Sequence, residues 1–359
     1  MGSLITYLSI FFTSTLCLNE GRKKYNAINL WSLIGLSILV VFAAGRYHVG
    51  TDCNTYIHMF ERYAVLSWPQ IFNSGEVLFC ATAKICYMQG GRVLTWAVFA
   101  GLTVLPIYLA IYRQYPELYG FAAFFSFLTL YYAFSFNITR QFIAVALIVW
   151  GMKFVFENRL IPFLLVIVLA SGFHLSAPVA GLMWFLWDHK RNAPIEGQKK
   201  IILLLMITIV VFGYQEAISY ITGNISIFGG YSSYADTSTS GQNRDLYLHI
   251  VELIVFLLLK GKMKVEDERV EVMYSLLVIS VLIGFTGFTH PQVKRLAYYY
   301  AVPAKMILFG YLPNCFTENS KKLAVVLVCI YTTAYFTLTA YILGESNLIP
   351  YQFDLFSAW

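Results

Sequence analysis

The chain has 359 residues, of which 58% are apolar and only 12% are charged, and its formal net charge is +6. Soluble domains carry roughly 25% charged residues, because a folded globule needs a polar surface to stay dispersed. The composition therefore argues against soluble enzymes, disordered chains and nucleic-acid-binding proteins, and it indicates an integral membrane protein with several spans. The six cysteines show no CxxC or metal-ligand spacing, so no metal site is expected.

Ten apolar runs are long enough for helices that cross a hydrocarbon layer of roughly 30 Å. Two further regions are ambiguous: 76–88 is short, and 160–187 is interrupted by Gly172, His174 and Pro178. The second pattern fits two short helices that meet at a turn, or a re-entrant pair. We expect an all-α polytopic membrane protein, a single integral membrane domain over 1–359, with about 10–13 transmembrane or re-entrant helices. The ten runs are 3–18, 27–45, 93–112, 118–136, 141–157, 201–220, 246–259, 272–288, 297–312 and 324–343.

Lysine and arginine residues cluster in particular loops, and the positive-inside rule places these loops in the cytoplasm. One alternating path satisfies the rule if 160–187 goes out and back and 76–88 makes no net crossing. The outer face then receives both termini and two long loops. These loops are 46–92, with an interfacial or re-entrant helix, and 221–245, which is rich in Gly, Ser, Thr and Tyr. The second loop is either a flexible connector or a lid over the site.

Basic residues remain on the outer face, although the positive-inside rule should deplete it. Several lie at helix ends beside other polar residues, and the side chain of each could simply snorkel, placing its charged end at the membrane surface. Repeated at several helix ends, the pattern favours a shared site for phosphate or pyrophosphate, which guanidinium groups bind through forked hydrogen bonds. The basic residues on this face are Arg46, Arg62, Arg92, Arg140, Arg244, Lys294 and Arg295.

Three other polar residues on this face have both a structural and a functional interpretation. Asp52 follows a Gly50 turn and could cap a helix at 54–64, pair with an arginine, or act as a general base. Glu76 precedes a short apolar run and could begin a helix or be a buried carboxylate of the site. His174 lies at the break in 160–187, where an unpaired imidazole at membrane depth would be costly. No Walker loop, GxSxG elbow, HExxH pair or dinucleotide fingerprint is present.

In chain order, the outer-face motifs form a set that covers nearly the whole sequence. They are Arg46 with Val49-Gly50-Thr51-Asp52 and Tyr56, then Glu76, Asn137 with Arg140-Gln141, Phe173-His174 with Ser176, Lys294-Arg295-Leu296, and Pro350-Tyr351. This ordered set resembles the EpsG/Wzy family of bacterial O-antigen and exopolysaccharide polymerases. Glu76 departs from the family pattern, because the Pro-Gly that often follows this acid is missing here.

The resemblance implies a GT-C-like, Wzy-type architecture and a multi-pass glycosyltransferase of the bacterial inner membrane, with its active site facing the periplasm. Such enzymes transfer a growing glycan from undecaprenyl pyrophosphate to the non-reducing end of a lipid-linked repeat unit. They need no cofactor. The expected partners are undecaprenyl-pyrophosphate-linked oligosaccharides, membrane lipids and a chain-length regulator, with no nucleic acid.

On this interpretation His174 or Asp52 is the base that activates the acceptor hydroxyl, and Arg140 stabilises the leaving pyrophosphate. Two other functions stay open: an O-antigen-type ligase, which would share the pyrophosphate site, and a lipid-linked oligosaccharide flippase, which needs no base. The residues expected to bind substrate are Arg46, Tyr56, Glu76, Arg244, Lys294, Arg295 and Tyr351.

Overall fold

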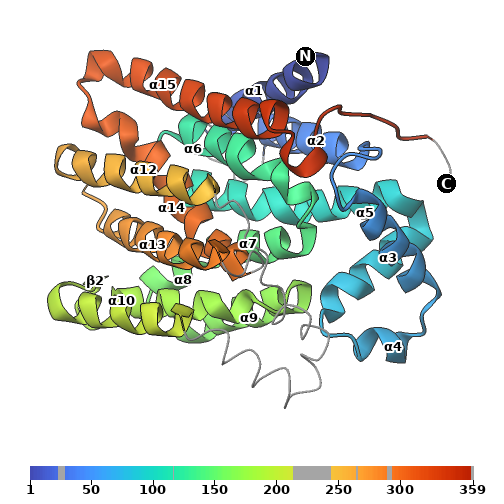
Figure 1. Cartoon of the computed structure of the whole chain (residues 1–359), viewed down its shortest axis with the longest axis horizontal. Coiled ribbons are helices and arrows are strands. Elements are labelled where there is room, and N and C mark those ends of the chain that lie inside the picture. The colour runs from blue at the N-terminus through green and yellow to red at the C-terminus, as the bar shows by residue number, and fades with distance from the viewer. Residues whose placement is uncertain (23–28, 116, 213–243, 264–265, 289–292, 357–359) are drawn as a thin grey trace.

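The computed structural model of the chain describes residues 1–22, 29–115, 117–212, 244–263, 266–288 and 293–356 (Figure 1). The described residues form an all-α membrane protein, as predicted, with one two-residue antiparallel strand pair, β1 (Trp187–Asp188) and β2 (Ala193–Pro194). The described parts of the ten predicted apolar runs are helical except for a few residues at their boundaries. Local apolar character therefore determined where the helices lie.

The longer helices run roughly along the long axis of the molecule (Figure 1). Within the described part of the chain, five segments are long and apolar enough to cross a membrane: Gly2–Arg22, Val77–Gln114, Thr139–Phe156, Arg269–Phe288 and Glu318–Ile342. The helices of this bundle are α1 (Gly2–Arg22), α2 (Leu30–Ala44), α5 (Val77–Gln114), α6 (Gly120–Phe127), α7 (Thr139–Gly151), α8 (Lys153–Phe156), α9 (Leu160–Phe173), α10 (Gly197–Phe212), α12 (Arg244–Leu259), α13 (Arg269–Gly284), α14 (Tyr298–Tyr311) and α15 (Glu318–Phe336).

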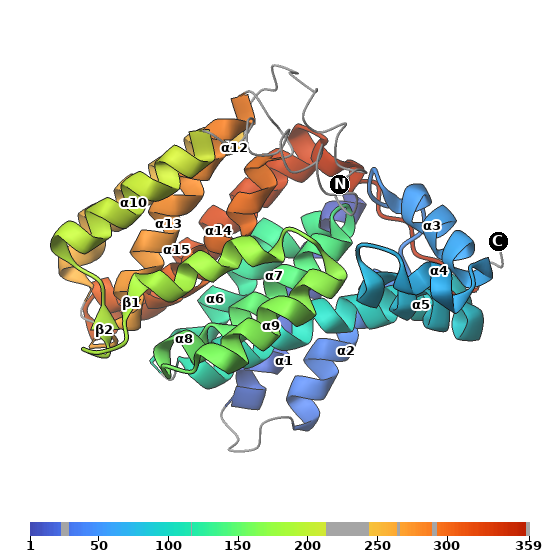
Figure 2. The same ribbon diagram turned by 90° about the horizontal axis from the view of Figure 1, so that it is seen from below.

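A smaller lobe projects from one end of the bundle (Figure 1 and Figure 2). It consists of α3 (Cys53–Val65), α4 (Trp68–Phe72) and residues 77–89 of α5, and we call this end of the bundle the lobe end. Helix α5 bends between the lobe and the bundle at Gly90 and Gly91. Gly91 has φ +58°, a conformation that costs glycine little and other residues more.

The lobe has its own hydrophobic core, distinct from the core of the bundle. Tyr56, Phe60 and Phe79 are fully or almost fully buried in it, together with Trp96 of the second part of α5. Ile143 of α7 and Phe173 of α9 complete this core. Because the lobe packs on residues from both helices, its position relative to their ends is fixed.

Residues 160–187 form two short helical segments that meet at a turn, which agrees with both of the predicted arrangements. Helix α9 ends at His174, whose extended backbone (φ −154°, ψ 120°) leads into a 3-10 helix, Ala177–Leu186. His174 therefore lies at the turn itself, as expected from the sequence. Gly172 lets this end approach the start of α5, since a Cβ there would lie 2.6 Å from the side chain of Leu78.

The C-terminal segment packs against the loop that precedes α3. The backbone N–H of Tyr47 donates to Gln352, that of Asp354 donates to Gly45, and that of Gly50 donates to Asn347, over 2.7–3.0 Å. These hydrogen bonds join the loop between α2 and α3 to the C-terminal segment at the lobe end. This pairing fixes the loop from which α3 and the lobe begin.

Candidate active site

The carboxylate of Glu76 joins two basic side chains from distant parts of the chain. Its Oε2 lies 2.5 Å from Nη1 of Arg140, and its Oε1 lies 2.6 Å from Nδ1 of His174. The backbone N–H of Leu175 also donates to Oε1, over 3.4 Å. We call Glu76, Arg140 and His174 the Glu76 cluster.

Three helix ends supply the Glu76 cluster. Glu76 occupies the N-cap position of α5, Arg140 is in the first turn of α7, and His174 follows the last residue of α9. Glu76 therefore has both of its predicted roles, because it begins a helix and is also a buried carboxylate, although its side chain makes no capping hydrogen bond. All three side chains lie at the lobe end, between the lobe and the bundle.

The Glu76 cluster is partly open. The carboxylate side chain of Glu76 is only 7% exposed, whereas the side chains of Arg140 and His174 are 32% and 19% exposed. Tyr56, almost fully buried in the lobe core, hydrogen-bonds to Arg140, and the guanidinium lies 5.7 Å from the ring of Phe79. The buried carboxylate therefore orients two side chains that a bound molecule can still reach.

The electrostatics of the Glu76 cluster keep the carboxylate ionised. Burial alone would raise the pKa of Glu76, but the hydrogen bond from His174 and the charge of Arg140 outweigh burial and lower the pKa below its usual value. An ionised carboxylate can only accept hydrogen bonds, so Nδ1 of His174 must carry a proton. In the neutral imidazole, Nε2 is then a free acceptor, which is the arrangement required of a general base.

Lys294 and Arg295 lie on a short turn, Val293–Ala297, that is tied to the same helix ends. The side-chain amide of Gln141 donates to the backbone carbonyl of Arg295 over 2.8 Å. The hydroxyls of Ser176 and Tyr299 lie 3.1 Å apart and join this region to the turn after His174. Gln141 belongs to the Asn137/Arg140-Gln141 motif, but the sequence predicted no role for it. Its hydrogen bond reaches a residue 154 positions away in the chain, and no local sequence pattern indicates such a contact.

Asp52 occupies the N-cap position of α3, as expected, but its carboxylate makes no capping hydrogen bond. Its backbone N–H lies 3.4 Å from the side-chain oxygen of Asn137, whose amide nitrogen donates to Ser346 over 2.9 Å. Asn137 therefore joins the loop before α3 to the C-terminal segment. Asp52 interacts electrostatically with Tyr56, which hydrogen-bonds to Arg140, whereas His174 is in the Glu76 cluster itself.

Arg46 and Tyr351 make their described contacts outside the Glu76 cluster, and their role in binding substrate stays a prediction. The guanidinium of Arg46 is almost fully buried, 3.6 Å from the ring centre of Trp96 and 4.3 Å from that of Phe136. Tyr351 stacks on Phe42 at 4.3 Å and donates to its carbonyl. Both side chains hold the C-terminal segment and the preceding loop on the bundle. The side chain of Arg244 and most of the loop 221–245 fall outside the described residues.

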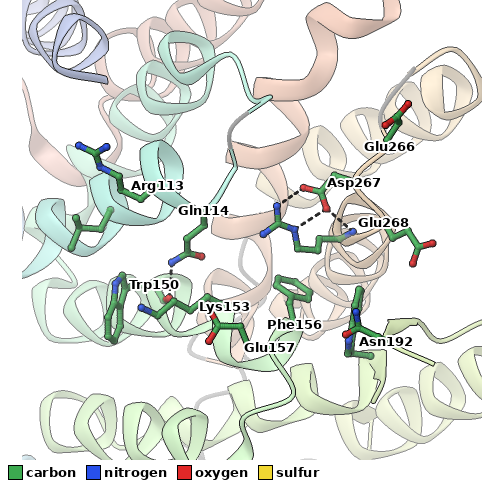
Figure 3. Close-up of a pocket in the computed structure, with 13 residues that line it drawn as sticks. Arg113, Gln114, Trp150, Lys153, Phe156, Glu157, Asn192, Glu266, Asp267 and Glu268 are labelled. Atoms are coloured by element: carbon green, nitrogen blue, oxygen red, sulfur yellow. Dashed lines mark hydrogen bonds and ion pairs between the residues drawn. The ribbon is translucent and has the colours of Figure 1, made fainter. Parts of the chain in front are cut away.

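A cavity of about 730 Å³ lies at the opposite end of the bundle (Figure 3). The C-terminal ends of α5 and α7 line it, whereas their N-terminal ends carry the Glu76 cluster. Its lining mixes both signs of charge, and two hydrogen bonds of 2.7 and 2.6 Å already pair Arg269 with Asp267. None of the residues predicted for the site lines this cavity, so its size alone does not identify it as the active site.

A second ionic cluster lies inside the bundle, and we call its residues, Glu252, Lys305 and His249, the Glu252 cluster. The carboxylate of Glu252 pairs with Lys305, whose ammonium lies 2.7 Å from Nδ1 of His249. Tyr331 donates to Glu252 over 2.8 Å. All three side chains of the Glu252 cluster are almost completely buried. Among the described residues, no group of three or more His, Cys, Asp or Glu is arranged to hold a metal ion.

The fold and the Glu76 cluster together define a multi-pass, all-α membrane protein with a partly open, charged polar site at one end of its helices. The family model described as "EpsG family" matches residues 29–353, nearly the whole chain. The protein belongs to the EpsG family, as its motifs led us to expect, and membership supports a role of the polysaccharide-polymerase type. No curated protein and no solved structure matches the chain significantly.

Proposed function

We propose that the protein is a polysaccharide polymerase of the bacterial inner membrane. It transfers a growing glycan from undecaprenyl pyrophosphate to the non-reducing end of a lipid-linked repeat unit, at the periplasmic face. The observation that carries this proposal is the Glu76 carboxylate, which orients an arginine and a histidine from two other helix ends at once. Transfer from a lipid diphosphate needs both an anion-stabilising group and a base, and the Glu76 cluster contains one of each.

The proposed reaction is a single displacement at the anomeric carbon of the growing glycan. Nε2 of His174 removes the proton of the acceptor hydroxyl as its oxygen forms the new bond to that carbon. The bond between the carbon and the diphosphate oxygen breaks, and the electron pair leaves with the diphosphate. Glu76 holds His174 in the required tautomer and stabilises the imidazolium that forms, as the acid does in a catalytic triad.

The arginines in this mechanism stabilise charge on the leaving diphosphate. Arg140 bonds to Glu76 and Tyr56 but its side chain is one-third exposed, so the exposed part of its guanidinium can bind phosphate oxygens. Gln141 ties the turn that carries Lys294 and Arg295 beside Arg140, which brings further positive charge to the same helix end. Removing one such donor should cost roughly 100-fold or more in rate.

The distribution of basic residues supports a periplasmic site. Lys260, Lys262 and Arg269 lie at the end of α12 and the start of α13, and Arg113 lies at the end of α5. These are the opposite ends of the helices from the lobe end, where the Glu76 cluster lies. The positive-inside rule assigns the opposite end to the cytoplasm and the lobe end to the periplasm.

The test is Arg140→Ala in a cell that lacks its own copy of the gene, with Arg159→Ala as the matched control. Arg159 is also ion-paired to a carboxylate, Glu157 at 3.2 Å, but at the opposite end and on the surface. We expect Arg140→Ala to abolish long polymer at a normal protein level, and Arg159→Ala to leave it unchanged. Long polymer of normal length in Arg140→Ala cells would contradict the proposal.

Product analysis separates the polymerase from the two other functions. In the Arg140→Ala cells, a polymerase leaves single repeat units on the final acceptor, whereas a ligase leaves finished polymer on its carrier lipid. A flippase would form no glycosidic bond when the purified protein is given two lipid-linked units. Formation of a longer lipid-linked glycan by the purified wild type, and its loss in Arg140→Ala, is the result expected here.

A further inference from the structure

We propose that the lobe rests on the membrane surface through an apolar tip, formed by Trp68 and Phe72 of α4. The partner is the boundary between lipid headgroups and acyl chains at the lobe end. The polar face of α3 then points to water. This inference concerns how the lobe is held and does not depend on the reaction proposed above.

The exposed residues of the tip are large and apolar. Phe72 is 63% exposed and Trp68 is 42% exposed, whereas Ile71 between them is completely buried in the lobe core. Helix α4 is thus amphipathic, with Trp68 and Phe72 on one face, their rings stacked at 5.9 Å. Ile85 and Met88 of α5 add two more exposed apolar side chains to the lobe.

The exposed face of α3 has the opposite character. Its exposed positions include Asn54, His58 and Arg62, which follow one another at four-residue spacing and therefore share one side of the helix. Val65, the last residue of α3, is an exposed apolar residue at the end of this side. The buried positions of α3 are Cys53, Tyr56, Ile57 and Phe60. One lobe therefore presents a polar face and an apolar tip. If water surrounded the whole lobe, its exposed apolar tip would be unfavourable, because exposed apolar area lowers stability and promotes aggregation.

The tip is held rigidly, which distinguishes it from a flexible loop. The backbone N–H of Ser67 donates to Gln70 over 2.9 Å and closes the start of α4. The buried ammonium of Lys84 donates to the carbonyls of Ala64 and Leu66, over 2.6 and 2.8 Å, and so satisfies the end of α3 next to α4. The exposure of Trp68 and Phe72 is therefore part of the folded lobe.

The tip continues the lipid-facing surface of the bundle, and this continuity selects lipid as the partner. Helix α9 exposes Leu165, Val168 and Leu169, which in a membrane protein face acyl chains. Its end meets the segment after α4, since a Cβ on Gly75 would lie 2.9 Å from the side chain of Leu175. Aromatic residues at the end of a lipid-facing surface are typical of the interfacial belt.

The arrangement has a consequence for the depth of the Glu76 cluster. Phe72 precedes Glu76 by four residues, and the segment between them contacts the turn that carries His174. A tip anchored at the headgroup boundary therefore places Glu76 close to the level of lipid phosphates. A lipid-linked molecule could reach this level by lateral diffusion without leaving the bilayer.

The experiment places a spin label on the tip and on the polar face of the full-length protein in lipid nanodiscs. Labels at Phe72→Cys and His58→Cys are compared for collision with oxygen, which concentrates in lipid, and with a water-soluble nickel complex. Wild-type protein carried through the same labelling gives the background from the six native cysteines. We expect the oxygen-to-nickel collision ratio to be several-fold higher at position 72 than at position 58.

The alternative outcomes overturn the proposal in distinguishable ways. Equal ratios at both positions would place the tip in water. Low collision rates with both reagents at position 72 would mean that protein covers it, either a second copy or a different chain. In either case the polymerase proposal would stand, because it depends on Arg140 and His174.

A second pair of variants avoids cysteine altogether. Phe72→Asp places a charge on the tip without removing a core side chain, and His58→Asp makes the matched change on the polar face. If lipid covers the tip, the midpoint of thermal unfolding in nanodiscs should fall by several degrees for Phe72→Asp and change little for His58→Asp. Equal midpoints for the two variants would contradict the inference.

Discussion

The Glu76 cluster and the Glu252 cluster contain the same kinds of side chain, a carboxylate, a histidine and a strong base, in two different environments. In the Glu252 cluster the three side chains are almost completely buried, and a tyrosine hydroxyl occupies the remaining carboxylate position. In the Glu76 cluster only the carboxylate is buried, and the arginine and histidine are partly open. The first arrangement can only hold helices together, whereas the second can also bind a molecule from outside. Exposure, rather than composition, separates a structural ionic cluster from a candidate site.

His174→Ala is the strongest test of the difference between the Glu76 cluster and the Glu252 cluster. Loss of the base should lower the rate of glycosidic bond formation by roughly 10²–10⁴-fold, while the folded protein stays at its normal level because His174 is partly exposed. The measurement is the initial rate with purified protein and lipid-linked oligosaccharides, alongside the level of protein in the membrane. Asp52→Asn serves as the comparison, because the sequence left His174 and Asp52 as alternative bases. A larger loss in Asp52→Asn than in His174→Ala would assign the base to Asp52.

Lys305→Met should have the reverse effect, on stability rather than on rate. It leaves the Glu252 carboxylate buried without its ammonium partner, and losing one member of a buried ion pair costs about 3–5 kcal/mol. We expect a lower unfolding midpoint and less protein in the membrane. The double variant Lys305→Met with Glu252→Gln should recover much of both, because no buried charge is then left unpaired.

Lys322→Met, on an exposed position at the start of α15, is the control for this change. It should leave the midpoint unchanged. If Lys305→Met folded normally but failed to form glycosidic bonds, the Glu252 cluster would have a role in the reaction. The assignment of the Glu252 cluster to stability alone would then be wrong.

Gly50→Ala should have an intermediate effect near the Glu76 cluster. Gly50 has φ +100°, which side chains disfavour, and a Cβ there would lie 2.4 Å from the side-chain oxygen of Asn137. The strain should cost about 1–3 kcal/mol and displace the loop that leads to Tyr56. The unfolding midpoint and the rate per folded molecule should both fall modestly. An unchanged midpoint would mean that the loop before α3 adjusts freely.

The smallest effect is expected from pH. The pKa of Glu76 is lowered in the folded protein, so its ionised form contributes stability that is fully present above the usual value of 4.5. This contribution is lost as the pH falls through the lowered pKa. The difference in unfolding midpoint between wild type and Glu76→Gln should therefore be constant near neutral pH and shrink in acid. A difference that is the same at every pH would show that the carboxylate is not ionised in the fold.

The sequence by itself determined the elements and the kind of site. Apolar runs are local properties of the chain, and each described run forms a helix because a membrane requires the backbone to satisfy its own hydrogen bonds. The break at His174 could also be predicted, since Gly172 and Pro178 interrupt an otherwise apolar segment. The distribution of basic residues predicted that Glu76, Arg140 and His174 lie on the same face of the membrane. In the structure these three side chains are in contact.

Only the tertiary structure decided which polar residues meet. Glu76 bonds to partners 64 and 98 residues away, and nothing in its local sequence distinguishes that role from the start of a helix. Arg46 belonged to the same sequence pattern as Arg140, yet its guanidinium packs against Trp96 and Phe136, whereas that of Arg140 pairs with Glu76. The length of an apolar run depends only on residues that are consecutive in the chain, so it can be determined directly from the sequence. Ion pairing and burial depend on which helix ends the fold brings together, and that information is spread over the whole sequence.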